Sequence, residues 1–469
     1  MIEFDRGSFR DPAGSIFYFN DGVYRTINKQ RMLEFRELRE SGVLASLIKD
    51  GWLIDSEEVC PSLVSGFGER APEALVKHRK LEVISYPYEW SFSQLKDAAL
   101  FHLDFHLKLL ENGWSLTDAT AYNVQFHGES CRPIFIDLLS IRPYQDGEYW
   151  LGQRQFCEQF LNPLLLQSKM GVRSNSWYRG ALEGISIEDM AKLLPWSSRF
   201  SWVLLSNIIL PNYFQKKSLG TKRLSNTKAK SSVKRPFPKQ AYVGLLKSLR
   251  NFIAKLFLGQ GNAGVWENYE FENFYSDAGR RVKEQVLEEF CKSISPSALI
   301  DMGCNSGHYS QLALEFGSKS VVGFDFDSGS LNLAYCRAKE NQLRLIPLYM
   351  DACNPSPSIG WDSSERKGIK SRVSADAVIA FAIIHHLAIG RNIPLEQVID
   401  WLLSFGDSGI IEFVGKEDIS IKEMLALRED VFPDYTYDNF INILAARRKV
   451  VKEVAVEGVD RVLVWYEKE

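Results

Sequence analysis

The feature that most constrains the fold is a strand–turn–helix pattern near residue 300. An apolar run from Leu299 ends on Asp301, and a turn with Gly303 and Gly307 follows it. Helical periodicity comes next, and a second apolar run ends on Asp325. Alternating strands and helices predict a parallel sheet, and such sheets bind ligands beyond the carboxyl ends of their strands. The pattern therefore predicts an α/β fold with a small-molecule site in the C-terminal third of the chain.

The spacing of the turn distinguishes between two classes of cofactor. A dinucleotide site needs G-x-G-x-x-G, so that helix N–H groups can bind a pyrophosphate. Here the run is Gly303-x-Asn305-x-Gly307, with no glycine three residues after Asn305. Asp301 would repel a pyrophosphate but attract an ammonium group. S-adenosylmethionine (SAM) carries an ammonium group and no phosphate, and Asp325 can accept hydrogen bonds from ribose hydroxyls. The spacing therefore favours SAM over a nicotinamide dinucleotide.

Residues 265–469 resemble the class I SAM-dependent methyltransferases, and the alternative is a structural turn in another doubly wound fold. The turn from Asp301 to Gly307 matches the family's first motif. Asp325 and Asp351 match its acids for the ribose and for the adenine amino group, and Asp376–Leu387 matches its fourth motif. The resemblance implies a Rossmann-like sheet with the family's seven strands and SAM as the cofactor. It also implies the following cofactor-binding residues: Asp301, Gly303, Cys304, Asn305, Gly307, Asp325, Asp351 and Ala352.

Three residues near the expected fourth and fifth strands are candidates for a general base. His385 and His386 follow the fourth strand, and Glu412 lies on the next strand, Gly409–Val414. Imidazole titrates near neutrality and can take a proton from an acceptor hydroxyl. The acceptor oxygen would attack the methyl group in line, and the protein would mainly orient the two reactants. We therefore predict O-methylation, with His385, His386 or Glu412 as the base.

Other residues flank the expected cofactor turn. Asn305 stands where the family frequently has a glycine, and its side chain could contact the methionine carboxylate. His308 is expected to start a helix and to touch the cofactor. Trp266, Tyr269 and Tyr275 precede the first strand and could cover the sulfonium through cation–π contact, or they could pack as part of the first helix.

Length and composition exclude several protein classes. At 469 residues, two or three domains are expected. The apolar content of 45% is ordinary for a soluble protein, and a net charge of −3 provides no global attraction to nucleic acid. Seven scattered cysteines without a C-x-x-C pair predict reduced thiols in a cytoplasmic compartment and no zinc site. His102 and His106 lie one helical turn apart, but without a third ligand we expect a surface pair and not a metal site.

A basic segment divides the chain. Residues 215–240 contain nine Lys or Arg and no acid, which predicts a solvated linker. Residues 241–258 have helical apolar periodicity, and we expect a helix packed against the methyltransferase sheet. The alternative is a peripheral contact of residues 215–258 with the anionic inner face of a membrane. The expected units are an N-terminal α+β domain (1–213), the linker (214–240), a helical connector (241–264) and the methyltransferase domain (265–469).

The N-terminal unit carries a second set of polar residues at the ends of expected elements. A hairpin is expected around Asn20–Gly22, and helices are expected at 31–39 and 93–110. Further on, Asp118 is followed five residues later by Asn123, and a buried strand then ends on Asp137. This order resembles the core of protein-kinase-like and aminoglycoside-phosphotransferase-like folds. In those folds one carboxylate orients a hydroxyl, while the amide and the second carboxylate hold Mg-ATP.

Departures from that pattern argue against active phosphotransfer. The expected third strand has no Lys, and Arg25 is its nearest basic candidate, with Glu34 or Glu37 facing it. No His-Arg or His-Gly precedes Asp118. The unit could therefore be kinase-like but inactive. In the plainest interpretation Asp118 caps a turn and Asn123 satisfies a loop.

The two units together resemble a bacterial two-part family that includes nodulation-type host-specificity proteins. The resemblance implies a glycan or another small hydroxyl compound as the acceptor. The alternatives are a bifunctional kinase–methyltransferase, and a methyltransferase joined to a non-catalytic module that binds the substrate or a partner. No nucleic-acid partner is expected, and the sequence does not determine the oligomeric state. The segments that carry the resemblance are Asp11–Gly14, Ser85–Phe92, Tyr122–Phe126 and Arg154–Cys157.

Overall fold

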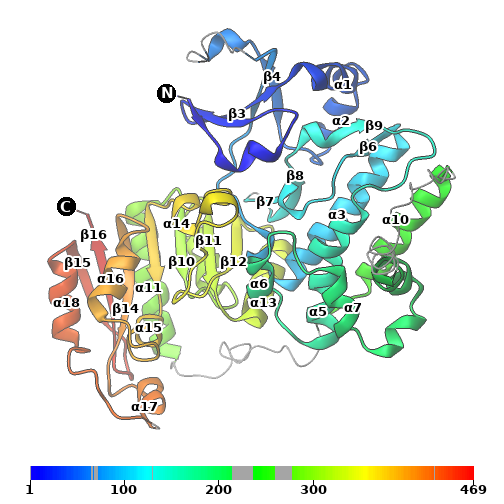
Figure 1. The fold of residues 1–469 in the computed structure, drawn as a ribbon. Helices are drawn as coiled ribbons and strands as arrows, with labels where there is room; N and C mark the ends of the chain where they lie inside the picture. The colour runs from blue at the N-terminus through cyan, green and yellow to red at the C-terminus, as the bar shows by residue number, and fades with distance from the viewer. Residues whose placement is uncertain are drawn as a thin grey trace.

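The structure is a computed structural model, and it describes residues 2–64, 67, 72–128, 130–213, 236–258, 277–426 and 428–468. It consists of an N-terminal unit, with a small sheet above a helical part, and a C-terminal α/β unit beside that helical part (Figure 1). None of the helices in these ranges is both long enough and apolar enough to span a membrane.

The N-terminal sheet has five antiparallel strands in the order β1-β2-β3-β5-β4. Its strands are β1 (Glu3–Phe4), β2 (Ile16–Phe19), β3 (Gly22–Ile27), β4 (Ser56–Val59) and β5 (Ala74–His78). The turn between β2 and β3 places Asn20 and Asp21 at positive φ, which these residues tolerate better than most, so the expected hairpin is confirmed. Helix α1 (Lys29–Glu40) confirms the helix predicted at 31–39 and precedes α2 (Val43–Lys49).

The helical part is built around α3 (Phe92–Glu111), which confirms the helix predicted at 93–110. Two short hairpin-like ladders lie beside it, β6 (Trp114–Leu116) with β9 (Ile141–Pro143) and β7 (Val124–His127) with β8 (Arg132–Phe135). The remaining helices are α4 (Gln153–Phe156), α5 (Asn162–Met170), α6 (Asn175–Gly180), α7 (Ile187–Leu193) and α8 (Trp202–Leu204).

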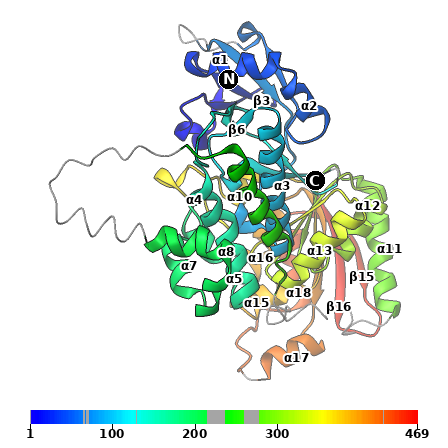
Figure 2. The same ribbon diagram turned by 90° about the vertical axis from the view of Figure 1, so that its right-hand side faces the viewer.

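The helix expected within residues 241–258 is α10 (Lys239–Ala254), and it packs along α3 (Figure 2). The prediction that it packs on the methyltransferase sheet is wrong, because its partner is the N-terminal unit. Its apolar side chains Tyr242, Leu246, Leu249 and Ile253 are buried. The N-terminal unit therefore covers the apolar face of α10, which the membrane alternative expected to contact lipid. Residues 214–235, which include most of the basic segment, lie outside the described ranges.

The C-terminal sheet has seven strands in the order β12-β11-β10-β13-β14-β16-β15. Five neighbouring strands are parallel, and β16 is antiparallel to both β14 and β15. The strands are β10 (Leu299–Met302), β11 (Val321–Asp325), β12 (Leu345–Tyr349), β13 (Ala377–Ala380), β14 (Ser408–Val414), β15 (Lys449–Ala455) and β16 (Arg461–Glu467). The chain runs outward from β10 to β12 and then returns to β13, so the order reverses between β10 and β13. The expected α/β class is confirmed.

Helices accompany this sheet along the chain, as the spacing of its strands requires. Their bounds are α11 (Asp277–Ile294), α12 (His308–Glu315), α13 (Ser328–Glu340), α14 (Ile369–Arg372), α15 (Ile384–Ala388), α16 (Leu395–Leu403), α17 (Ile419–Leu425) and α18 (Tyr437–Ala445).

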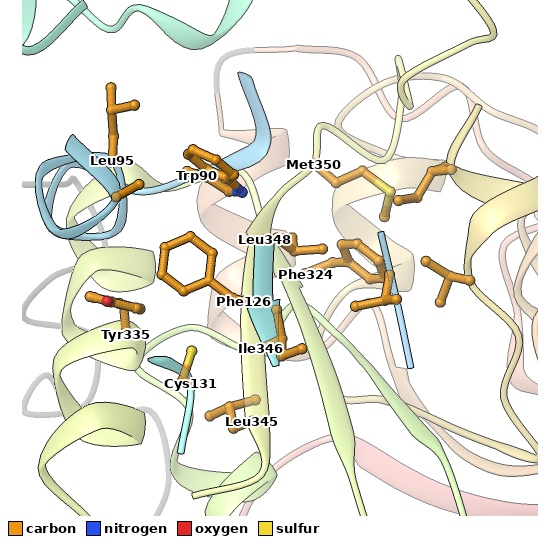
Figure 3. Packing of buried hydrophobic residues seen from close by; sticks show 14 of the residues in the cluster. Trp90, Leu95, Phe126, Cys131, Phe324, Tyr335, Leu345, Ile346, Leu348 and Met350 are labelled. Atoms are coloured by element: carbon orange, nitrogen blue, oxygen red, sulfur yellow. The ribbon is translucent and has the colours of Figure 1, made fainter. Parts of the chain in front are cut away.

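One continuous apolar core joins the two units. Trp90 and Phe126 of the N-terminal unit pack near Tyr335 and the strand β12 (Figure 3). The Tyr335 hydroxyl donates to the Asp97 carboxylate at 2.8 Å, and the Lys339 ammonium approaches the same carboxylate at 2.6 Å. A further ion pair joins Arg372 to Glu89, and both of these side chains are buried. The N-terminal unit is therefore packed against the edge of the sheet that carries β12.

Candidate functional site

A cleft of about 290 Å³ lies at the carboxyl ends of β10, β11, β12 and β13. This is the point at which the strand order reverses, where open α/β sheets bind their ligands. The residues that line it follow these strands, and they include Gly303, Asn305, Asp325, Phe326, Asp351, Ala352, Phe381, Ile383, His386 and Arg391.

Backbone hydrogen bonds to strand β11 hold the turn after β10. The amides of Gly303 and Cys304 both donate to the Phe324 carbonyl, at 2.8 and 3.0 Å. Gly303 and Gly307 have φ values of +85° and +78°, which glycine adopts without strain. Asn305 also has a positive φ, and its side-chain oxygen accepts from the Ser306 amide at 2.6 Å. The glycine spacing thus produces a tight turn whose backbone faces the cleft.

Both oxygens of Asp325 are held by backbone hydrogen bonds. Its Oδ2 accepts from the Asn305 amide and its Oδ1 accepts from the Asp327 amide, both at 2.8 Å. Burial raises the pKa of this carboxyl to about 6, although the backbone N–H groups oppose the shift. Each carboxylate oxygen can accept more than one hydrogen bond. Both oxygens are therefore suited to accept from the two hydroxyls of a ribose as well.

The other predicted cofactor residues fall into two groups. Gly303, Asn305, Asp325, Asp351 and Ala352 line the cleft, and the Oδ1 of Asp351 accepts from the Cys353 amide at 2.9 Å. Asp301, Cys304 and Gly307 are not among the lining residues.

Asp301 and Gly307 instead contribute to the packing around the turn. Asp301 is buried and accepts from the Ser310 hydroxyl at 2.6 Å, and burial raises its pKa to about 7. A Cβ at Gly307 would lie 3.2 Å from the side chain of Leu345, so the turn packs closely on β12. The two acids and the glycine turn that line the cleft fit SAM.

The three predicted bases differ in position. His386 lines the cleft, and burial lowers its pKa to about 4, so its imidazole is neutral at pH 7. His385 is completely buried next to it, with ring centroids 4.1 Å apart, and is not among the lining residues. Glu412 is also buried, and Lys283 approaches one of its oxygens at 2.9 Å while Arg461 approaches the other at 3.6 Å. Of the three candidates, His386 alone lines the cleft.

Lys283 is a feature that sequence analysis missed. Its ammonium lies 5.0 Å from the ring centre of Tyr309 and 4.8 Å from that of Phe381, which lines the cleft. Burial lowers the pKa of Lys283, and the adjacent Glu412 opposes this shift. A single lysine on the amphipathic helix α11 gives no sequence signal, because its partner lies on a strand more than a hundred residues later.

Two further predictions concern residues near the turn. His308 does start α12, but its ring lies 3.6 Å from Glu284 and it is not among the residues that line the cleft. Trp266, Tyr269 and Tyr275, predicted to cover the sulfonium, lie outside the described residues.

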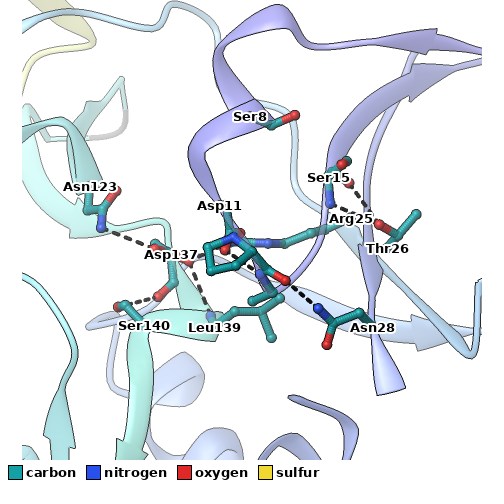
Figure 4. A network of polar contacts seen from close by, with 12 residues as sticks. Ser8, Asp11, Ser15, Arg25, Thr26, Asn28, Asn123, Asp137, Leu139 and Ser140 are labelled. Carbon is teal, nitrogen blue, oxygen red and sulfur yellow. Dashed lines mark hydrogen bonds and ion pairs between the residues drawn. The ribbon is translucent and has the colours of Figure 1, made fainter. Parts of the chain in front are cut away.

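A second polar cluster lies between the sheet and the helical part of the N-terminal unit, and Figure 4 shows four of its residues, Asp11, Arg25, Asn123 and Asp137. Asp118 belongs to the same cluster through its hydrogen bond with Asn123. Arg25 on β3 pairs with Asp11 and, at 2.5 Å, with Asp137. The Asn123 amide donates to Asp118 at 3.3 Å and to Asp137 at 3.2 Å. Burial and the nearby Asp137 raise the pKa of Asp118 to about 7. The structure therefore brings together the three residues that the sequence singled out.

Other expectations for this unit are wrong. Glu34 does not face Arg25, because it pairs with Arg31 on its own helix, and Asp11 is the partner that sequence analysis missed. His102 and His106 are not on the surface, because both are completely buried among aromatic rings. Within the described ranges, the structure contains no group of three or more His, Cys, Asp or Glu that could hold a metal ion.

Comparison with known proteins identifies the family. No family model matches the sequence. The chain is 45% identical over 464 residues to the nodulation protein NoeA of Rhizobium meliloti (strain 1021), which covers 98% of this chain and 95% of that protein. The chain belongs to the NoeA family. This confirms the nodulation-type family expected from the sequence.

More distant similarities of this NoeA-family chain involve methyltransferases. It is 25% identical over 162 residues to the tRNA U34 carboxymethyltransferase of Campylobacter jejuni, which covers 34% of this chain and 48% of that protein. The N-methyltransferase NodS from Bradyrhizobium japonicum is 14% identical with a TM-score of 0.31, covering 41% of this chain and 99% of NodS. The bifunctional kinase–methyltransferase WbdD is 15% identical with a TM-score of 0.29, covering 43% of this chain and 41% of WbdD.

The strand order reverses between β10 and β13. The glycine turn, Asp325 at the end of β11 and Asp351 after β12 line one cleft at this edge of the sheet. These features of this NoeA-family chain fit the SAM-dependent methyltransferase expected from the sequence.

Proposed function

We propose that the chain transfers the methyl group of SAM to a hydroxyl group of a glycan or of another small acceptor. The observation that carries this proposal is that His386 and the two cofactor acids line the same cleft. SAM, when bound, supplies a methyl group that its sulfonium has already activated. Gly303 and Asn305 would hold the methionine part, and Asp325 and Asp351 would bind the ribose and the adenine.

His386 would take the proton from the acceptor hydroxyl. Burial lowers its pKa to about 4, so the imidazole is neutral at pH 7 and can accept a proton. The same shift makes it a weaker base than a free imidazole, so the proton would move as the new bond to the methyl group forms. His385 and Glu412 would have structural roles. His385 is enclosed beside His386, and Glu412 is bound by Lys283 and Arg461. A neutral base that lines the cofactor cleft fits transfer to a hydroxyl.

The glycan acceptor is supported by the family, whose named relative is a nodulation protein. The carboxymethyltransferases named above act on tRNA, but a net charge of −3 gives this chain no general attraction to RNA. The test is to incubate the full chain with SAM and with a panel of oligosaccharides, sugar lipids and tRNA. A mass gain of one methyl group on a sugar is expected. Methylation of tRNA alone would overturn the acceptor class.

His386→Ala tests the base. We expect kcat to fall about 100-fold, the size of a typical general-base contribution, while the affinity for S-adenosylhomocysteine (SAH) is retained. His308→Ala is the matched control, because that histidine pairs with Glu284 and does not line the cleft. An unchanged kcat in His386→Ala would mean that orientation alone is sufficient.

For the N-terminal unit we propose a kinase-like module without phosphotransfer activity. The meeting of Asp118, Asn123 and Asp137 supports the kinase-like arrangement. Against activity, the guanidinium of Arg25 binds one oxygen of Asp137 and neutralises the charge that would hold Mg²⁺, while Asn123 donates to the other oxygen. Calorimetry with Mg-ATP on the full chain should show no binding. ATP-dependent phosphate transfer that Asp137→Ala abolishes would instead establish a bifunctional enzyme.

A further inference from the structure

Two arginines of the N-terminal unit reach the loops of the cofactor cleft. Arg173, between α5 and α6, donates to the Phe326 carbonyl at 3.1 Å. Arg179, on α6, donates to the Asn354 carbonyl at 2.9 Å. Phe326 comes directly after Asp325, the acid proposed to bind the ribose. The segment 173–179 therefore contacts the loop after β11 and the loop after β12.

Backbone contacts connect the second arginine to the adenine end of the cleft. The Asn354 amide donates to the Asp351 carbonyl at 2.9 Å, so the carbonyl that Arg179 binds belongs to the same turn as Asp351. The Asp351 carboxylate closes that turn by accepting from Cys353. Movement of Asn354 would therefore move the acid that is proposed to bind the adenine amino group.

A small cavity between the two units has a wall in common with the cofactor cleft. Its volume is about 40 Å³, and Tyr88, Asn175 and Arg179 line it from the N-terminal unit. From the other unit it is lined by residues that include Met350 and Asp351, and both of these also line the cofactor cleft. Met350 and Asp351 therefore lie between the cofactor cleft and a cavity that the N-terminal unit also lines.

The helix that carries Arg179 is itself anchored. The buried side chain of Asn175 donates to the carbonyls of Tyr88 and Trp90, at 3.0 and 3.1 Å. That segment is fixed in turn to the C-terminal unit, because Glu89 forms the buried ion pair with Arg372. The contacts of Arg173 and Arg179 are therefore made from a support that is rigidly joined to the sheet.

We propose that the N-terminal unit is part of the cofactor site, with Arg173 and Arg179 as positioning residues for the loops that bind ribose and adenine. The inference rests on the proposed SAM site and adds a role for the N-terminal unit that requires no chemistry from it. Loops already held in their binding geometry lose less conformational freedom when the ligand binds. The affinity for SAM should therefore depend on residues of the N-terminal unit.

The test uses the full chain with the double substitution Arg173→Ala and Arg179→Ala. Loss of two hydrogen bonds to the loops is expected to weaken SAH binding about tenfold by calorimetry. KM for SAM should rise by the same factor, while kcat at saturating SAM and the melting temperature stay unchanged. Arg199→Ala is the control, because Arg199 is an exposed arginine of the same unit and lies outside the small cavity. Arg179→Lys should lose less affinity for SAH than Arg179→Ala, since lysine can also donate to the Asn354 carbonyl.

The possible outcomes separate this inference from the proposed function. Tight SAH binding by both the wild type and the double variant would overturn the positioning role and leave the methyltransferase site intact. A fall in kcat together with a lower melting temperature would also overturn it, because that result indicates general destabilisation. Absence of SAH binding by the wild-type chain would overturn the cofactor site, and the inference with it.

Discussion

The cofactor cleft and the N-terminal polar cluster both contain acids at or near the ends of strands, but different groups bind these acids. In the cleft, two backbone N–H groups hold Asp325, and they are neutral donors. In the polar cluster, Arg25 pairs with both Asp11 and Asp137. Neutral donors leave the charge of a carboxylate available to a ligand, whereas a guanidinium neutralises it within the fold.

The difference shows that a strand ending on an acid does not by itself indicate a ligand site. The sequence pattern is similar at Asp137 and at Asp325, since both acids end apolar runs. What separates them is a cation on a strand distant in sequence, together with the space in front of the carboxylate. Substitutions in the polar cluster should therefore change the stability of the protein, whereas substitutions in the cleft should change the binding of the cofactor.

The largest effect is expected for Arg25→Leu. This substitution leaves Asp11 and Asp137 partly buried without their cation, and breaking a buried pair by removing one partner costs about 3–5 kcal/mol. The free energy of unfolding should fall by that amount in urea denaturation. Arg25→Lys should lose less, because it keeps the charge. A stability equal to that of the wild type would mean that the cluster is not neutralised by Arg25.

Asp325→Ala should have the next largest effect, and on binding. Loss of two hydrogen bonds to a charged acceptor, at about 1.5–3 kcal/mol each, is expected to weaken SAH binding at least 100-fold. Asp11→Ala is the matched substitution in the polar cluster, and calorimetry should show wild-type affinity for it. If Asp325→Ala also binds SAH as the wild type does, this acid is not the ribose ligand.

The pH dependence of binding should be smaller, about tenfold. The pKa of Asp325 is raised to about 6, so its carboxylate is mostly ionised at pH 7 and mostly protonated at pH 5. A protonated carboxyl is a weaker acceptor for the ribose hydroxyls. Affinity for SAH should therefore fall as the pH falls through 6, in a calorimetric series from pH 8 to pH 5. Asp325→Asn should bind weakly at every pH and without this dependence.

Asp118→Asn should have the smallest effect. The raised pKa of about 7 means that between about pH 4 and pH 7 the folded state keeps a proton that the unfolded state has released. The stability of the wild type therefore decreases as the pH rises through this window. The amide does not titrate, so the variant should lose less stability between pH 6 and pH 8, by on the order of 1 kcal/mol. Parallel stability curves for the two proteins would contradict a raised pKa at Asp118.

The sequence predicted what depends on residues close together in the chain. The turn from Asp301 to Gly307 could be predicted because the glycine positions, the preceding strand and the following helix are all local. The hairpin at Asn20–Gly22 and the helices α1 and α3 were predictable for the same reason. Local hydrogen bonds and apolar periodicity determine such elements.

Contacts between distant segments were not predictable in this way. The partner of α10 was wrongly predicted, because an amphipathic face specifies burial but not the surface that buries it. His102 and His106 were expected on the surface, yet the aromatic rings around them come from several elements. Glu412 lies on the predicted strand, but its pairing with Lys283 and Arg461 could not be foreseen from its position.

The sequence by itself determined the α/β sheet, the glycine turn and the acids that follow β11 and β12, because strand and helix periodicity bring these residues to one edge. Only the tertiary structure decided which of three predicted bases lines the cleft and which acids are neutralised by Arg25. It also decided that Arg173 and Arg179 reach the cofactor loops. The physical reason is that charge pairing and burial depend on distances in space, which the order of residues along the chain does not contain.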